Sequence, residues 1–187
     1  VKNYGTSVAY ECMGKTITFN EVDKLSKDFA SYLQNHLKLK KGDRVAIQMP
    51  NCLQYPVAMF GVLRAGMVVV NTNPLYTPSE MKHQFNDSGA DLVVIVANFA
   101  SNLEKIRTEI QAKHIITTEL GDLLGGLKGM IVNLVVKHVK KMVPAYSLPG
   151  SVSLKAALSK GATYQLKRVK CSLDDAAFLQ YTGGTTG

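Results

Sequence analysis

The chain has 187 residues, of which 46% are hydrophobic and 19% charged, a composition that excludes intrinsic disorder and is typical of one globular domain. The 22 Lys and Arg residues exceed the 14 Asp and Glu residues, so the net charge is +8. The three cysteines, Cys12, Cys52 and Cys171, are too widely spaced to indicate a disulfide framework or a thiolate metal site. We therefore expect a reducing, cytoplasmic location. No apolar run approaches the roughly 20 residues of a membrane-spanning helix.

The two ends of the sequence indicate a piece of a longer protein. The first residue is Val1 rather than methionine, and no signal-peptide pattern follows it. The last residue, Gly187, interrupts a run of glycine and threonine that is expected to continue.

The first 40 residues predict a hairpin followed by a helix. Val8–Glu11 and Thr16–Thr18 are short extended runs on either side of a turn. Asn20 is a suitable N-cap residue, and apolar residues then recur at three- and four-residue spacing. An amphipathic helix is therefore expected over Asn20–Leu37.

Short apolar runs then alternate with amphipathic helical patterns. Continuous apolar runs are typical of strands buried on both faces, and they occur at Val45–Ile47, Met67–Val70, Leu92–Val96 and His114–Thr117. The helices between them are expected from a cap at Asn51 to Gly66, from a cap at Thr77 to Ser88, and through Leu103 to Gln111. This order predicts parallel strands joined by right-handed crossover helices, and so a layered α/β fold.

A basic segment interrupts this alternation. Residues 123–173 contain no Asp or Glu but nine Lys and Arg residues, so the whole positive excess lies here. Within it, Leu127–Val143 predicts an amphipathic helix, with lysines opposite the apolar side: Lys137, Lys140 and Lys141. Such a helix can lie on an anionic membrane surface, or its apolar side can pack on the sheet or on another domain. A short helix over Val152–Lys160 and a last strand over Ala176–Gln180 are expected after it.

The chain closes with a loop of glycines and threonines directly after that strand: Tyr181, Thr182, Gly183, Gly184, Thr185, Thr186 and Gly187. Glycines let backbone N–H groups approach an anion, and threonine hydroxyls add donors, so the loop is suited to phosphate. Neither G-x-x-x-x-G-K-[ST] nor G-x-G-x-x-G fits it. By composition alone, a flexible surface turn is an equal alternative.

The order of these residues resembles the phosphate-binding signature of the acyl-adenylate-forming (AMP-binding) enzymes. Glycine at the second loop position, Gly183, resembles the bacterial long-chain fatty-acid–CoA ligases in particular. Further segments are similar to that branch and extend over nearly the full chain: Lys41–Ala46, Met49–Asn51, Leu53–Ala58, Phe60–Gly66, Val70–Thr77 and Asn86–Ala90.

The resemblance implies the N-terminal part of the acyl-adenylate-forming fold, with residues 1–187 as a fragment of the large AMP-binding domain and 123–173 as an insertion-like segment within it. It implies a two-step reaction in which a fatty acid carboxylate attacks the α-phosphate of ATP, and the thiol of coenzyme A (CoA) then displaces AMP. ATP, Mg²⁺ and CoA are the implied cofactors. Tyr181–Gly187 would bind the nucleotide, with the threonine hydroxyls of Thr182, Thr185 and Thr186 as donors.

Tyr181 would anchor that loop, or is a plain core tyrosine. The resemblance places no catalytic or metal-binding residue within the 187 residues, because the family's later segments are missing. The isolated chain is therefore expected to be inactive.

Two other functions stay open beside this one. The protein could adenylate another acyl, aryl or amino acid, or it could be a membrane-surface interaction module built on Leu127–Val143. A peripheral location on the inner membrane face and a homodimer also stay open. Nucleic-acid binding is not expected, because the basic segment offers only Tyr146 and Tyr164 for stacking on bases. Asn71 and Asn73 are interpreted as turn residues.

Overall fold

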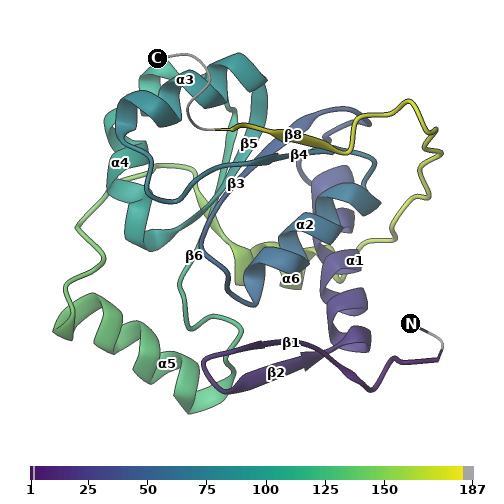
Figure 1. Cartoon of the computed structure of the whole chain (residues 1–187), viewed down its shortest axis with the longest axis horizontal. Helices are drawn as coiled ribbons and strands as arrows, with labels where there is room; N and C mark the ends of the chain where they lie inside the picture. The colour runs from purple at the N-terminus through teal and green to yellow at the C-terminus, as the bar shows by residue number, and fades with distance from the viewer. Residues whose placement is uncertain (2, 183–187) are drawn as a thin grey trace.

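Six parallel strands form the central sheet of the computed structural model, which describes residues 1 and 3–182 (Figure 1). Their order across the sheet is β7-β6-β5-β3-β4-β8, and each neighbouring pair is parallel. The strands are β3 (Arg44–Gln48), β4 (Val68–Asn71), β5 (Ala90–Val96), β6 (His114–Thr118), β7 (Val152–Ser153) and β8 (Phe178–Gln180). The predicted parallel α/β architecture is confirmed.

Helices cover both faces of this sheet. On one face lie α1 (Phe19–Asn35), α2 (Gln54–Arg64) and α6 (Leu154–Gly161); on the other lie α3 (Pro78–Ser88) and α4 (Ala100–Lys105) (Figure 1). Successive strand residues point to opposite faces, so Val45 and Ile47 pack with the first group and Ala46 with the second. Side chains on both faces of the sheet are buried, which explains why the strand sequences are continuous apolar runs.

The predicted cap of the first helix is wrong by two residues. Thr18 is the N-cap: its hydroxyl accepts from the Glu21 backbone N–H (3.2 Å), and the Glu21 carboxylate accepts from the Thr18 N–H (2.7 Å). This reciprocal pair is a capping box. Asn20 lies inside the helix, where its N–H donates to the Gly5 carbonyl (2.8 Å). The predicted cap at Thr77 is confirmed and forms the same arrangement with Glu80.

Two further helix predictions are wrong. Asn51 caps nothing: α2 starts at Gln54, after Leu53 in helical conformation without a side-chain cap. The helix expected through Gln111 ends at Lys105 and is followed by a 3₁₀ turn, Arg107–Glu109. Asn86 of α3 explains the break, because its side chain bonds the Glu109 carbonyl (2.8 Å) and the Gln111 N–H (3.1 Å) and so holds that segment away from helical geometry.

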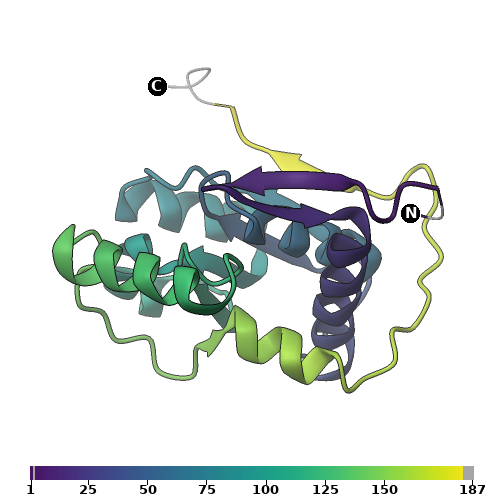
Figure 2. The same ribbon diagram turned by 90° about the horizontal axis from the view of Figure 1, so that it is seen from below.

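The hairpin and the basic helix lie beside the main sheet. Strands β1 (Val8–Cys12) and β2 (Lys15–Thr18) pair antiparallel, as predicted. Helix α5 (Gly126–Leu134) continues as a π-helical turn, Val135–Val139, and lies next to the hairpin at an outer edge of the molecule (Figures 1 and 2). Within residues 1 and 3–182, no helix combines the length and hydropathy that crossing a bilayer requires.

The strand β7 was not predicted. Its two residues pair with Ile116 and Thr117 of β6, and the first residues of the helix expected over 152–160 form this strand instead. Ser153 then caps α6, because its hydroxyl accepts from the Ala156 N–H (3.2 Å).

Replacing Thr18 by alanine tests which residue caps α1. We expect Thr18→Ala to lower the free energy of unfolding in urea by about 1 kcal/mol, because the N-terminal N–H groups of the helix lose their acceptor. Asn20→Ala serves as the matched control and is expected to change this free energy by only a few tenths of that amount. A larger loss for Asn20→Ala than for Thr18→Ala would contradict the capping assignment.

Candidate functional site

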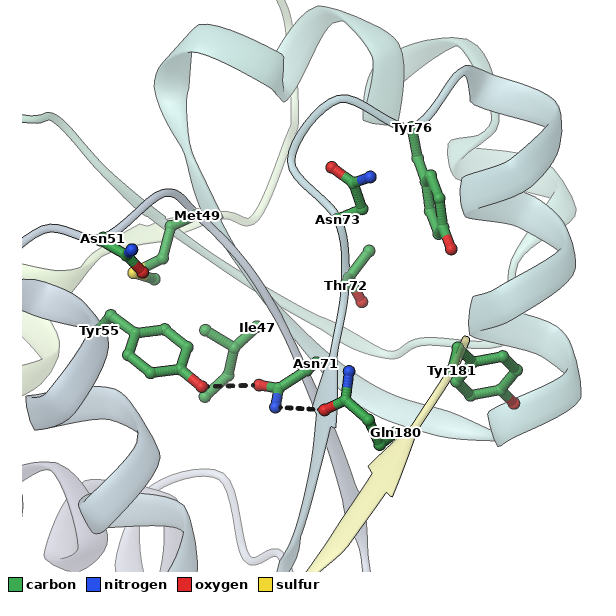
Figure 3. A pocket seen from close by; sticks show the side chains of 10 residues that line it. All are labelled: Ile47, Met49, Asn51, Tyr55, Asn71, Thr72, Asn73, Tyr76, Gln180 and Tyr181. Carbon is green, nitrogen blue, oxygen red and sulfur yellow. Dashed lines mark hydrogen bonds between the residues drawn. The ribbon is translucent and has the colours of Figure 1, made fainter. Parts of the chain in front are cut away.

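The carboxyl ends of β3, β4 and β8 border a pocket of about 350 Å³ (Figure 3). The chain leaves β3 towards α2 on one face of the sheet and leaves β4 towards α3 on the other. Diverging connections of this kind open a crevice at the carboxyl edge, where open α/β sheets bind ligands. The lining residues are Ile47, Met49, Asn51, Tyr55, Asn71, Thr72, Asn73, Tyr76, Gln180 and Tyr181.

A chain of side-chain hydrogen bonds crosses the pocket. The Tyr55 hydroxyl of α2 donates to Asn71 Oδ1 (2.9 Å), and Asn71 Nδ2 donates to Gln180 Oε1 (2.9 Å) (Figure 3). It joins α2 and β4 to β8, which is more than 100 residues away in the sequence. Strand β8 is at the sheet edge and pairs with β4 through three residue pairs, so these side chains add to a short ladder. The interpretation of Asn71 as a turn residue is wrong, because Asn71 is the last residue of β4 and its side chain bonds Tyr55 and Gln180.

Two buried glutamines hold the turn after β4. Gln48 Nε2 donates to the Asn73 carbonyl (3.2 Å), and Gln84 Nε2 donates to the Asn71 carbonyl (2.9 Å). Asn73 Oδ1 accepts from the Leu75 N–H (2.9 Å), which is the turn role expected for this residue. The turn is thereby tied to β3 and to α3, so the polar wall of the pocket is preorganised.

Tyr181 lies at the end of β8 and is half-buried. Its hydroxyl donates to the Asp87 carboxylate of α3. Burial raises the pKa of the Tyr181 hydroxyl to about 12, and the hydrogen bond to Asp87 and its negative charge act in the same direction. The strand end is therefore tied on one side through Gln180 and on the other through Tyr181.

The predicted nucleotide-binding loop begins at this point. The structure describes Tyr181 and Thr182, and Thr182 is exposed. Gly183, Gly184, Thr185, Thr186 and Gly187 lie outside the described residues, so their role stays a prediction. What the structure supplies is the start of the loop, next to the pocket.

The pocket is suited to binding rather than to proton transfer. Its lining residues supply amides, hydroxyls and apolar groups, with no carboxylate, imidazole or ammonium among them. Burial raises the pKa of the Tyr55 hydroxyl, so this phenol stays protonated at neutral pH and acts as a donor. Neutral donors and acceptors fit the sugar, base or phosphate groups of a nucleotide. Among residues 1 and 3–182, no group of three or more His, Cys, Asp or Glu side chains is placed to hold a metal ion.

Four residues that build this site were not predicted: Tyr55, Gln48, Gln84 and Gln180. One signal in the sequence marks part of this set. Gln48, Asn71 and Gln180 are polar residues that each follow an apolar run and end a strand. In a parallel sheet such positions meet at one edge.

The ionisation of Tyr181 tests its contact with Asp87. Because its pKa in the folded protein, about 12, lies above the usual 10.0, the stability it contributes is present below pH 10.0 and is lost as the pH rises towards about 12. We expect Asp87→Asn to lower the pKa of Tyr181. The titration is measured by the absorbance of tyrosinate, and the Tyr181 step is the one that is missing in Tyr181→Phe. An unchanged Tyr181 titration in Asp87→Asn would contradict the contact.

Comparison with known proteins identifies close relatives. The sequence profile described as "AMP-binding enzyme" matches residues 1–187. The chain is 54% identical over 189 aligned residues to the long-chain-fatty-acid–CoA ligase of Escherichia coli O6:H1, covering 100% of this chain and 33% of that protein. It is 52% identical over 187 residues to the enzyme of that name from Haemophilus influenzae, with the same coverage.

A solved structure shares the fold. The anthranilate CoA ligase AuaEII, in complex with anthranoyl-AMP, superposes with a TM-score of 0.76 at 18% identity, covering 98% of this chain and 30% of that chain. The expected N-terminal part of the acyl-adenylate-forming fold is therefore confirmed. The chain spans about a third of the length of the curated relatives it matches. Because the family profile matches the whole length of this chain, the chain belongs to the AMP-binding enzyme family.

Proposed function

We propose that the whole protein is a long-chain fatty-acid–CoA ligase that forms AMP. A fatty acid carboxylate attacks the α-phosphate of ATP, giving acyl-AMP and pyrophosphate, and the CoA thiol then displaces AMP. The observation that carries this proposal is identity above 50% along the entire chain to two proteins named as such ligases. Residues 1–187 form part of the large AMP-binding domain, and 123–173 are a basic insertion within it.

The geometry at the end of β8 supports nucleotide binding. Two hydrogen-bonded ties, Asn71–Gln180 and Asp87–Tyr181, hold the strand end from which the loop starts. A loop anchored in this way presents its donors without reorganisation, which is what stabilises charge developing on phosphate oxygens. Bound Mg²⁺ would share that charge and orient the pyrophosphate. Of the predicted hydroxyl donors, Thr182 is among the described residues, whereas Thr185 and Thr186 are not. The pocket lining contains no carboxylate, and the proposal places the Mg²⁺ ligands in the rest of the protein.

A second candidate is adenylation of a different acid. It is favoured by the superposition on the anthranilate CoA ligase AuaEII in complex with anthranoyl-AMP. Its 18% identity, against 54% to the fatty-acid enzyme, places it second. The finer parts of the proposal are a cytoplasmic location at the inner membrane face and assembly as a homodimer.

The reaction is tested on the whole protein by acid-dependent exchange of pyrophosphate into ATP. We expect exchange with oleate and not with benzoate or anthranilate. Thr185→Val and Thr186→Val remove predicted hydroxyl donors and are each expected to lower the exchange rate by roughly 100-fold. Thr163→Val is the matched control, because this threonine hydroxyl bonds the Lys160 carbonyl (2.8 Å), far from the pocket.

Exchange with an aryl acid in place of oleate would favour the second candidate. If none of the acids supports exchange, the proposal is overturned. The isolated 187-residue chain is expected to show no exchange, since it lacks most of the ligase.

Asn71 offers a test of how the loop is positioned. We expect Asn71→Leu in the whole protein to raise the KM for ATP about tenfold, because Gln180 and Tyr55 both lose a partner. Tyr55→Phe is expected to have a smaller effect, and the double variant to resemble Asn71→Leu, since both act on one hydrogen-bond chain. Steady-state kinetics measure this. Fully additive effects of the two substitutions would contradict a shared positioning role.

A further inference from the structure

Helix α5 and the π-helical turn after it expose an apolar surface. We call it the α5 face; its six large side chains are between 51% and 70% exposed: Leu127, Met130, Ile131, Leu134, Val139 and Met142. Leu127, Ile131 and Leu134 follow one another at helical spacing, so they form a continuous stripe. The apolar side of this helix was expected to pack on the sheet or on another domain, or to lie on a membrane. Packing on the sheet is wrong, because these side chains are exposed. Figure 2 shows α5 at the rim of the molecule.

The outward orientation of this stripe is built into the packing. Gly129 is on the opposite side of α5, and a Cβ atom there would lie 2.3 Å from the Gly121 carbonyl oxygen. Asn133 accepts from the Gly121 N–H (2.7 Å) and donates to the Asp122 carboxylate (3.3 Å). Lys128 also donates to the Met13 carbonyl of the hairpin (2.6 Å). The helix is therefore locked with its small and polar side inward.

The charged residues in the segment that carries the α5 face are all positive. Lys137, Lys140 and Lys141 are exposed and form no ion pair with the described residues. No Asp or Glu occurs between residues 123 and 173. The nearest carboxylate on the inner side, Asp122, is largely buried and pairs with Lys155 (3.0 Å). The face therefore combines apolar side chains with uncompensated lysines.

We propose that the α5 face binds the surface of a bilayer that contains anionic lipid. A helix of this kind lies in the plane of the interface, with its apolar stripe among the upper acyl chains and its lysines at the phosphates. A second copy of this chain is disfavoured, because a two-fold contact through this face would bring like charges together. The α5 face lies apart from the end of β8, so docking leaves the nucleotide pocket open (Figure 1).

This surface extends the proposed function without depending on it. Long-chain fatty acids partition into bilayers, so a ligase docked there would meet its substrate at high local concentration. Membrane binding itself follows from the α5 face alone. It can be measured on the whole protein without any ligase assay.

The test is flotation of the whole protein with vesicles of phosphatidylcholine mixed with phosphatidylglycerol, and with vesicles of phosphatidylcholine alone. We expect binding to the mixed vesicles only, reversed by high salt. The variant Lys137→Gln/Lys140→Gln/Lys141→Gln is expected to bind at least about tenfold more weakly. The matched control is Lys27→Gln/Lys105→Gln/Lys170→Gln, which removes the same charge from exposed sites elsewhere and should bind as the wild type does.

A second pair of variants tests the apolar stripe. Ile131→Gln/Leu134→Gln should lose most binding, whereas Leu173→Gln, which changes an exposed leucine outside the face, should not. Ligase activity towards fatty acid in detergent micelles should be unchanged in all of these variants. Loss of that activity in every protein, wild type included, would overturn the proposed function and leave the flotation result standing.

Accessibility of residue 131 identifies other occupants of the α5 face. In a Cys171→Ser background, Ile131→Cys should react with a water-soluble maleimide without vesicles and be protected by mixed vesicles. Protection without lipid at every protein concentration would mean that the remaining part of the protein covers the α5 face. Protection that grows with protein concentration would mean a second copy covers it. Either result, or equal flotation of the stripe variant and the wild type, would overturn the proposal.

Discussion

The parallel pairing of β8 with β4 is the contact on which the site depends. It brings residues 178–180 beside residues 69–71, across more than 100 positions of the sequence. Only three residue pairs make this ladder, at the edge of the sheet, and the loop expected to bind phosphate starts at its end. Asn71 holds Gln180, and Asp87 holds Tyr181, which follows it. These side-chain hydrogen bonds therefore add to the three backbone pairs that place β8.

The other elements position this edge. Four further parallel strands, packed between two helical layers, give β4 a buried base. Gln48 and Gln84 donate hydrogen bonds to carbonyl groups at the end of β4 and in the turn after it, and so hold this turn against β3 and α3. The hairpin and α5 contribute nothing to the pocket and instead form a separate surface. The pocket and the α5 face, which carry the two proposals, are therefore built from separate parts of the chain.

Local patterns in the sequence were sufficient to predict the central layers. Met67–Val70 and Leu92–Val96 are continuous apolar runs typical of buried strands, and they lie on β4 and β5. Thr77 with Glu80 is a complete capping signal. The failures occur where distant contacts decide. Asn86 bonds Glu109 and Gln111, more than 20 residues away, after the end of α4. Strand β7 is two residues that pair only because β6 lies beside them. Thr18 was missed because Asn20 is an equally good cap by residue type, and only the position of Glu21 distinguishes them.

The sequence predicts a phosphate-binding loop after the last strand but not the hydrogen bonds that hold this strand. The loop Tyr181–Gly187 is visible in the sequence. The hydrogen bonds from Tyr55 through Asn71 to Gln180 require knowing that α2 and the ends of β4 and β8 meet. The orientation of α5 was equally hidden, because an apolar stripe has the same spacing whether it faces a core or solvent. The contact between Gly121 and Gly129 decides it.

The central claim is that β8, held on β4, delivers this loop to the phosphates of a nucleotide. A crystal structure of the whole protein with a non-hydrolysable ATP analogue tests it most directly. The account predicts phosphate oxygens about 3 Å from donors of residues 182–187, with Asn71 still bonded to Gln180. A triphosphate bound away from this loop, or a β8 that pairs with a strand other than β4, would contradict it.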